Sequence, residues 1–294
     1  METLRVGTRS SALALKQTEL VIEALKRVDP SVNVEVVGIT TKGDRLVHVP
    51  LTQIGGKGVF VKEVEAQLLD KTIDFAVHSL KDVPARLPEG LTIVATPKRA
   101  NPFDCLIWND DKSFYGVTAP LVIGTSSVRR INQLKTVFPN LSFVPIRGNI
   151  ETRLRKMKEE GLDGIVLAAA GLERMDYLEG LHTLMLEPEV CTPAIGQGIM
   201  AVQCREEDKE IIELLSGIND QTAWMASLTE RFFLHRANGN CDLPIGGYAH
   251  PLDDGKWEFL AFLANSIDEP GVRKRYVGDD PLKLAELAAD ELLP

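Results

Sequence analysis

The chain has 294 residues, of which 44% are hydrophobic and 26% charged, which is typical of a globular protein with room for two or three domains. Its formal net charge of −9 argues against a protein built to bind nucleic acid, and no apolar run approaches the length of a membrane span. The first residues contain neither an apolar signal core nor an Arg- and Ser-rich presequence. We therefore expect a cytoplasmic protein that binds neither nucleic acid nor membranes.

The four cysteines form no CxxC pair, and the five histidines show no metal-ligand spacing. In a chain of this length the pattern predicts reduced thiols and no metal site. We expect Cys105, Cys191 and Cys204 to be buried and inert.

The first hundred residues alternate between apolar or β-branched runs, which predict strands, and amphipathic stretches, which predict helices. In chain order we expect a strand at 4–6, a Gly-Thr turn at 7–11, a helix to about 29, a strand at 32–39, a helix at about 59–69 and a strand from 75. The polar segment 40–58, which contains the pair Gly55-Gly56, is predicted to be a mobile loop or lid.

The stretch 74–84 combines a predicted strand with polar residues at its end. The apolar run 75–77 is followed by Ser79, Lys81 and Asp82, and Pro84 cannot extend a sheet. These side chains should therefore lie at the carboxyl end of a strand, where open α/β sheets bind ligands. A solvated Lys-Asp pair in an ordinary loop is the alternative.

The middle of the chain repeats the same order of elements. We expect a strand at 121–123, a Gly-Thr turn at 124–127 opening a helix, a strand at 141–146, a loop at 147–149, a helix from 150 and a strand at 164–167. Two related α/β halves are therefore predicted. Candidate hinges lie at 97–102 and 188–198, and a strand at 199–204 is expected to return to the first half, the usual wiring of a hinge-closing ligand binder.

From about residue 221 the pattern changes to a helix, a loop containing Cys241, two strands and a last helix. We expect three domains: residues 1–98 with 199–217, residues 99–198, and a small α+β domain at 218–294.

Both Gly-Thr turns open helices, whose unpaired N–H groups favour carboxylate or phosphate. Simple N-capping by Ser and Thr is the alternative reading. Arginines follow both turns, and we expect a cleft shared by six of them: Arg9, Arg129, Arg130, Arg147, Arg153 and Arg174. Six guanidinium groups can hold several carboxylates, which suggests a small ligand with many anionic groups. A solvated helical face is preferred for Arg155, Lys156 and Lys158.

Cys241 lies among Gly, Asn, Asp and Pro, which predicts an accessible sulfur in a loop. No His or Asn partner for a thiolate dyad is evident, so covalent attachment of a group is favoured over nucleophilic catalysis.

These motifs resemble the hydroxymethylbilane synthase family, also called porphobilinogen deaminases. The resemblance runs through essentially the whole chain and is strongest at Gly7–Leu15, Asp74–Pro84, Gly124–Arg130, Arg147–Asn149, Leu167–Leu172 and Ala194–Gly198. The cysteine loop departs from the usual Gly-Gly-Cys of the family, because here Asn240 precedes Cys241 and Asp242 follows it.

The resemblance implies a monomer with two periplasmic-binding-protein-like (type II) α/β domains joined by a two-segment hinge, plus a small α+β C-terminal domain. It implies a dipyrromethane cofactor linked by a thioether to Cys241. Four porphobilinogen molecules would be added head to tail with loss of ammonia, and water would release hydroxymethylbilane. The implied activity is that of a transferase of tetrapyrrole and heme biosynthesis.

The resemblance also assigns roles to residues. Asp82 matches the catalytic aspartate, which would stabilise the azafulvene cation and shuttle protons. Besides Cys241, the positions that match cofactor-binding ones are Lys81, Thr125, Ser126, Ser127, Arg129, Arg130, Arg147 and Gly148. Those that match substrate-binding ones are Arg9, Ser11, Arg147, Arg153 and Arg174. Lys57 and Phe60 match the active-site loop. Two rival readings stay open: a two-lobed anion-binding protein without chemistry, and a synthase that folds but fails to load its cofactor.

Overall fold

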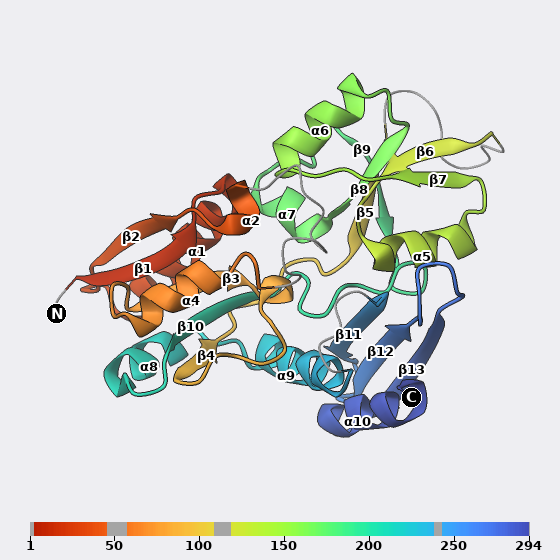
Figure 1. The fold of residues 1–294 in the computed structure, drawn as a ribbon. Coiled ribbons are helices and arrows are strands. Elements are labelled where there is room, and N and C mark those ends of the chain that lie inside the picture. Colours follow the sequence, from red (N-terminus) through yellow and green to blue (C-terminus); the bar gives the residue numbers. More distant parts are fainter. Residues whose placement is uncertain (1–2, 46–57, 109–118, 238–242, 294) are drawn as a thin grey trace.

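The computed structural model describes residues 3–45, 58–108, 119–237 and 243–293. They form two five-stranded sheets and one three-stranded sheet, each covered by helices (Figure 1). Within these residues no helix has both the length and the apolar character that crossing a bilayer requires.

The first sheet has the order β2-β1-β3-β10-β4. Its strands are β1 (Leu4–Arg9), β2 (Val34–Ile39), β3 (Phe75–Ser79), β4 (Leu91–Ala95) and β10 (Met200–Arg205). The first three are parallel, whereas β10 runs antiparallel to both β3 and β4. Phe75 and Val77 pack in one core with α1 (Ala12–Val28) and α8 (Lys209–Ser216), and Ala76 packs in another with α4 (Lys62–Leu69). Successive residues of β3 therefore alternate between two buried faces.

The second sheet repeats this order as β7-β6-β8-β5-β9. Its strands are β5 (Asp104–Trp108), β6 (Leu121–Gly124), β7 (Leu141–Val144), β8 (Gly164–Ala168) and β9 (His182–Leu186). The strand in fourth place, β5, is again antiparallel to both neighbours. Residues of α6 (Ile150–Glu159) and α7 (Ala169–Arg174) pack in one core, and α5 (Val128–Val137) contributes to the other.

The third sheet is antiparallel and consists of β11 (Ile245–Pro251), β12 (Trp257–Leu263) and β13 (Val272–Gly278). Helices α9 (Gln221–Arg236) and α10 (Pro281–Leu292) pack on it, and the rings of Phe233 and Phe259 meet edge to face at 5.6 Å. The same core includes Leu80 from the turn after β3 and Ile195 from the segment before β10. The third sheet is therefore anchored on the first sheet and on a segment that crosses between the two large ones.

Two segments cross between the large sheets, one between β4 and β5 and one between β9 and β10. Both include the positions predicted as hinges. The carboxylate of Glu230 on α9 is fully buried and accepts hydrogen bonds from Arg99 (2.6 Å) in one crossing and from the backbone N–H of Gly196 (2.7 Å) in the other. Helix α9 thus holds both crossings with one charged side chain.

In the described parts of the chain, the five longest helices each begin after an N-cap residue whose side chain accepts a backbone N–H. These N-caps are Ser11, Ser127, Asn149, Asp220 and Asp280 for α1, α5, α6, α9 and α10. Such caps satisfy donors that the helix itself leaves unpaired, so the sequence fixes where these helices start.

The predicted fold class of two α/β halves and a small α+β unit is confirmed. Strands β4, β5, β9 and β11 and helices α7 and α8 were not predicted from the sequence. The segment expected to be a loop from residue 40 includes a short helix, α2 (Lys42–Arg45), and the helix expected from 59 begins at Lys62. The rest of the predicted lid, 46–57, lies outside the described residues. We propose that the three sheets mark the three domains, with the boundaries expected from the sequence.

Candidate active site

The first Gly-Thr motif was expected in a turn, but Gly7, Thr8 and Arg9 are the last residues of β1. Gly124 of the second motif is likewise the last residue of β6, and α1 and α5 follow the two strands. Ser11 accepts from the N–H of Ala14 and Ser127 from that of Arg130, each at 3.4 Å. The capping role considered for these serines is therefore confirmed, whatever else they bind. Ser126 instead contacts Ile146, two residues after β7. Its hydroxyl donates to the carbonyl of Ile146 (3.0 Å) and accepts from the backbone N–H of Ile146 (3.1 Å).

The two arginines of the second turn are buried on one carboxylate. Arg129 donates to Asp104 Oδ2 at 2.7 Å, and Arg130 donates to Oδ1 through Nε (3.0 Å) and Nη2 (2.7 Å). Gln197 Nε2 and the thiol of Cys191 also contact this carboxylate, at 3.0 and 3.2 Å. Asp104 is 0% exposed, and the arginines are 5% and 7% exposed. The second turn thus carries an ion-paired platform fixed from inside the protein.

Burial acts to raise the pKa of Asp104, but the charges of Arg129 and Arg130 outweigh it and hold that pKa well below the usual range. One carboxylate therefore faces two guanidinium groups and is ionised at any neutral pH. Nη1 of Arg129 donates also to Thr192 O (2.6 Å), and Nη1 of Arg130 donates to Val166 O (2.7 Å). Asp104 follows a Pro-Phe pair at the start of an apolar run, and this buried acid was missed in the sequence.

The loop after β7 brings further positive charge. Gly148 adopts a φ of +122°, and a Cβ built there would lie 2.6 Å from a methyl group of Thr152, so the position requires glycine. Arg153 donates through Nε to the carbonyl of Gly148 at 2.8 Å. Burial, followed by the charges of Arg130 and Arg147, lowers the pKa of Arg153 to about 10, and the charge of Asp82 opposes this. These three arginines therefore share one electrostatic environment with Asp82.

Lys81 and Asp82 lie in the 3₁₀ turn Leu80–Asp82 that directly follows β3. Burial lowers the pKa of Lys81 to about 8; the charges of Arg129 and Arg130 act in the same direction, and those of Asp82 and Asp104 oppose it. The end of β3 in the first sheet therefore faces the arginine platform of the second sheet.

Arg9, the arginine of the first turn, has a different environment. Its guanidinium is ion-paired with Asp44 of α2 and lies over the ring of Phe60, 4.2 Å from the centroid. Both charged side chains are 24% exposed. Arg9 also influences the titration of His78 on β3, so it lies near the same strand end. Lys57 of the predicted active-site loop lies outside the described residues.

Arg174 at the end of α7 donates to the carbonyl of Gly198 in the second crossing, at 2.8 Å. Burial lowers its pKa to about 10, and the charge of Glu173 opposes this. The structure thus groups Arg129, Arg130, Arg147 and Arg153 with Lys81 and Asp82, and it places Arg174 at the crossing.

Cys241 lies outside the described residues. The other three cysteines are buried and unpaired, as predicted. Burial raises the pKa of Cys105 and Cys204 to about 11 and that of Cys191 to about 12, which leaves them as unreactive thiols.

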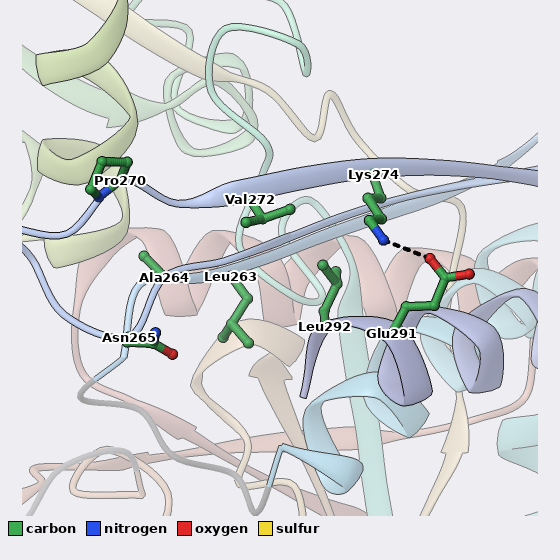
Figure 2. Close-up of a pocket in the computed structure, with 8 residues that line it drawn as sticks. All are labelled: Leu263, Ala264, Asn265, Pro270, Val272, Lys274, Glu291 and Leu292. Carbon is green, nitrogen blue, oxygen red and sulfur yellow. Dashed lines mark hydrogen bonds and ion pairs between the residues drawn. The ribbon is translucent and has the colours of Figure 1, made fainter. Parts of the chain in front are cut away.

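A surface pocket lies in the third domain between β12, β13 and α10 (Figure 2). Its charged groups are Lys274 and Glu291, which pair with each other at 2.8 Å (Figure 2). Apolar side chains, Val272 and Leu292 among them, form much of its lining. The pocket has no base left over for an anionic ligand, unlike the end of β3. In the described parts of the chain no three His, Cys, Asp or Glu side chains are grouped as a metal site would require.

The charges at the end of β3 fit a ligand with several carboxylates. The coupled residues comprise five bases, Lys81, Arg129, Arg130, Arg147 and Arg153, and two acids, Asp82 and Asp104. With five bases against two acids, positive charge exceeds negative charge there. Carboxylates of a bound dipyrromethane would supply the missing negative charge.

The fold and this site define a class: a two-lobed α/β protein in which bases from both large sheets form a site suited to a small ligand with several carboxylates. The family model "Porphobilinogen deaminase, dipyromethane cofactor binding domain" matches residues 4–213. The chain is 45% identical over 293 residues to a porphobilinogen deaminase of Halalkalibacterium halodurans, covering 100% of this chain and 94% of that protein. It is 44% identical over 289 residues to one of Bacillus velezensis, covering 98% and 92%. The chain belongs to the porphobilinogen deaminase family.

Among solved structures, an ancestral cationic amino acid solute binding protein aligns over 73% of this chain and 86% of its own, with a TM-score of 0.45 and 14% identity. The fold class rests on the shared strand order of the two sheets and not on that alignment.

Proposed function

We propose that the end of β3 and the arginine platform of the second sheet form the active site of a hydroxymethylbilane synthase. As in the porphobilinogen deaminase family, the chain acts as a transferase. It joins four porphobilinogen molecules head to tail with loss of ammonia and releases hydroxymethylbilane by hydrolysis. The dipyrromethane, when bound, supplies the pyrrole end to which the first unit is added.

The observation that carries this proposal is the position of Asp82. Its charge acts on Lys81 beside it, on His78 of its own sheet and on Arg153 of the other sheet. A carboxylate surrounded by bases that hold the substrate's own carboxylates is suited to stabilise a cation formed when ammonia leaves. It is also placed to move a proton between the departing amine and the pyrrole nitrogen.

The other residues divide between holding the cofactor and holding the substrate. Cofactor carboxylates would be held by the side chains of Lys81, Thr125, Ser126, Ser127, Arg129, Arg130 and Arg147 and by the backbone of Gly148. Incoming and growing units would be held by Arg9, Ser11, Arg147, Arg153 and Arg174, with Phe60 and Lys57 covering the site. Attachment through Cys241, a monomeric state, cytoplasmic localisation and the lack of nucleic-acid or membrane binding remain predictions.

Intact-mass measurement tests attachment. Protein made in a host that produces porphobilinogen should carry a mass excess matching two linked pyrroles, and Cys241→Ala should lack it. Cys105→Ala is the matched control and should keep the excess, because Cys105 is buried. An unmodified wild-type mass would favour an anion-binding protein without chemistry or a synthase that fails to load.

Asp82→Asn tests the chemistry separately from loading. The variant should keep the mass excess and the fold but lose about 10²–10⁴ in turnover, the contribution typical of a positioned acid–base group. Asp70→Asn, on an exposed residue of the same domain, should release ammonia at the normal rate. Near-normal ammonia release from Asp82→Asn would remove Asp82 from this role.

A further inference from the structure

A chain of three buried polar side chains crosses the first sheet behind Asp82. Gln203 on β10 contacts His78 on β3, with Oε1 2.9 Å from Nε2, and its Nε2 donates to Oε1 of Glu65 on α4 at 3.1 Å. The exposed fractions are 5% for His78, 0% for Gln203 and 4% for Glu65. The chain lies on the α4 face of the sheet, the face to which Ala76 of β3 also points.

The hydrogen bonds of this chain have one consistent direction. Gln203 Nε2 donates to Glu65 Oε1, which is the pairing that a carboxylate acting as acceptor requires. The amide oxygen of Gln203 is then turned toward His78 and requires an N–H from it. The imidazole therefore carries its proton on Nε2 and keeps Nδ1 unprotonated. Reversing the amide would place two oxygens, those of Glu65 and Gln203, against each other, so the charge of Glu65 sets the tautomer of His78.

The same burial keeps the imidazole neutral. Burial lowers the pKa of His78 to about 4, and the charge of Arg9 acts in the same direction, while the hydrogen bond to Gln203 and the charge of Asp82 oppose it. Burial raises the pKa of Glu65, against the hydrogen bond from Gln203 and the charge of Lys62. A neutral imidazole beside Asp82 does not compete with a substrate cation for the charge of that carboxylate.

His78 and Asp82 are also close along the chain. His78 is the fourth residue of β3, and the 3₁₀ turn Leu80–Asp82 begins one residue after that strand ends. If the His78 side chain is held in one orientation, the end of β3 is held too, and with it the position of the turn that carries Asp82. Small displacements of a reacting group slow a reaction strongly: a shift of 1 Å can lower the rate about 10²-fold.

We propose that His78 is a positioning residue for Asp82, held neutral and in one orientation by Gln203 and Glu65. The proposal rests on the proposed role of Asp82. It assigns no contact with substrate to any of the three residues. It predicts that the rate of turnover depends on the charge of Glu65, a side chain buried on the far side of Gln203 from His78.

The decisive variant is Glu65→Gln, which keeps the shape of the side chain and removes its charge. We expect kcat to fall about tenfold with KM and the cofactor mass excess unchanged, because only the placement of Asp82 is disturbed. The ¹⁵N shifts of His78 should show the Nε2–H tautomer in the wild-type protein and a mixture in the variant. Glu63→Gln removes a charge from the same helix without breaking the chain, and it should leave kcat and the tautomer as they were.

A double-variant cycle separates this role from simple stability. In a His78→Asn background, Glu65→Gln should have no further effect on kcat, because both act through the imidazole. If His78→Asn does not fold, Gln203→Leu replaces it in the cycle and is expected to show the same loss. Unchanged kcat in Glu65→Gln, or additive losses in the cycle, would overturn the proposal. Retained turnover in Asp82→Asn would instead show that the proposed function of Asp82 is wrong.

Discussion

The two Gly-Thr turns have the same sequence pattern and the same serine caps, but they hold their arginines in opposite ways. In the second turn, Arg129 and Arg130 are buried on Asp104 and bonded to backbone carbonyls. In the first turn, Arg9 is partly exposed and pairs with Asp44 on a short helix. A shared motif therefore gives one rigid cationic surface and one adjustable one.

This difference suits a site that must keep one ligand and exchange others. Ions removed from water are held only by excellent geometry, and such geometry leaves little freedom to move. A partly exposed ion pair is weak and can be replaced by a competing carboxylate. The second turn is thus suited to a cofactor that stays in place, and the first to substrate units that arrive and move on.

Asp104→Asn should have the largest effect, because it leaves two buried guanidinium groups with a neutral partner. We expect a loss of about 3–5 kcal/mol in the free energy of unfolding, measured with urea, and loss of the cofactor mass excess. The folded pKa of Asp104 is depressed, so this stability is present above the unfolded pKa of about 3.9 and declines as pH falls below it. Glu291→Gln, which breaks an exposed pair, should leave the free energy of unfolding nearly unchanged. A comparably small cost for Asp104→Asn would show that the platform is not fixed by this carboxylate.

Lys81→Met should increase stability if the platform has excess positive charge. The pKa of Lys81 is about 8 in the folded chain, and about 10.4 is expected when unfolded. Stability of the parent therefore rises with pH between these values, and the full cost of the folded charge is present below pH 8. In a cofactor-free Cys241→Ala background, the gain from Lys81→Met should be largest below pH 8 and fade toward pH 10.

The exposed Lys283 on α10 provides the control for this experiment. Lys283→Met should leave the pH dependence of stability unchanged. A gain in Lys81→Met that does not vary with pH would mean that packing of the methionine, and not relief of charge, is responsible.

The sequence was sufficient to predict the elements that carry local signals. Strand-helix units were indicated by β-branched runs, Gly-Thr motifs and serine caps. The residues at the end of β3 were found because an apolar run gives way to polar residues ahead of Pro84. Asp104 was missed because its role depends on two arginines some 25 positions away, and an acid before an apolar run gives no local sign of burial. Glu230 was missed for the same reason, since its partners come from both crossings and from β11. Sequence also placed six arginines in one cleft, whereas the structure separates Arg9 and Arg174 from the group around Lys81 and Asp82.

The two N-capping serines test whether the turns do more than start helices. Ser11→Ala and Ser127→Ala should each cost about 1 kcal/mol in unfolding, because each removes one capping bond. If Ser127 also holds the cofactor, its variant alone should load less dipyrromethane by intact mass. Ser31→Ala, at an exposed turn, provides a control for loading. Equal loading of dipyrromethane in all three variants would show that Ser127 only caps the helix.

Asp44→Asn should have the smallest effect on stability and the most specific effect on the reaction. Burial acts to raise the pKa of Asp44, but the bonds from Arg9 and Thr41 outweigh it and lower that pKa, so the group is charged at neutral pH. The pair is partly exposed, so its loss should cost less than about 1 kcal/mol. Arg9 would then lose the carboxylate that orients it. KM for porphobilinogen should rise while loading at the second turn stays normal, because Arg129 and Arg130 do not depend on Asp44. Steady-state kinetics and intact mass on one preparation measure both. A variant that loads poorly but keeps its KM would reverse the assignment of the rigid and the adjustable turn.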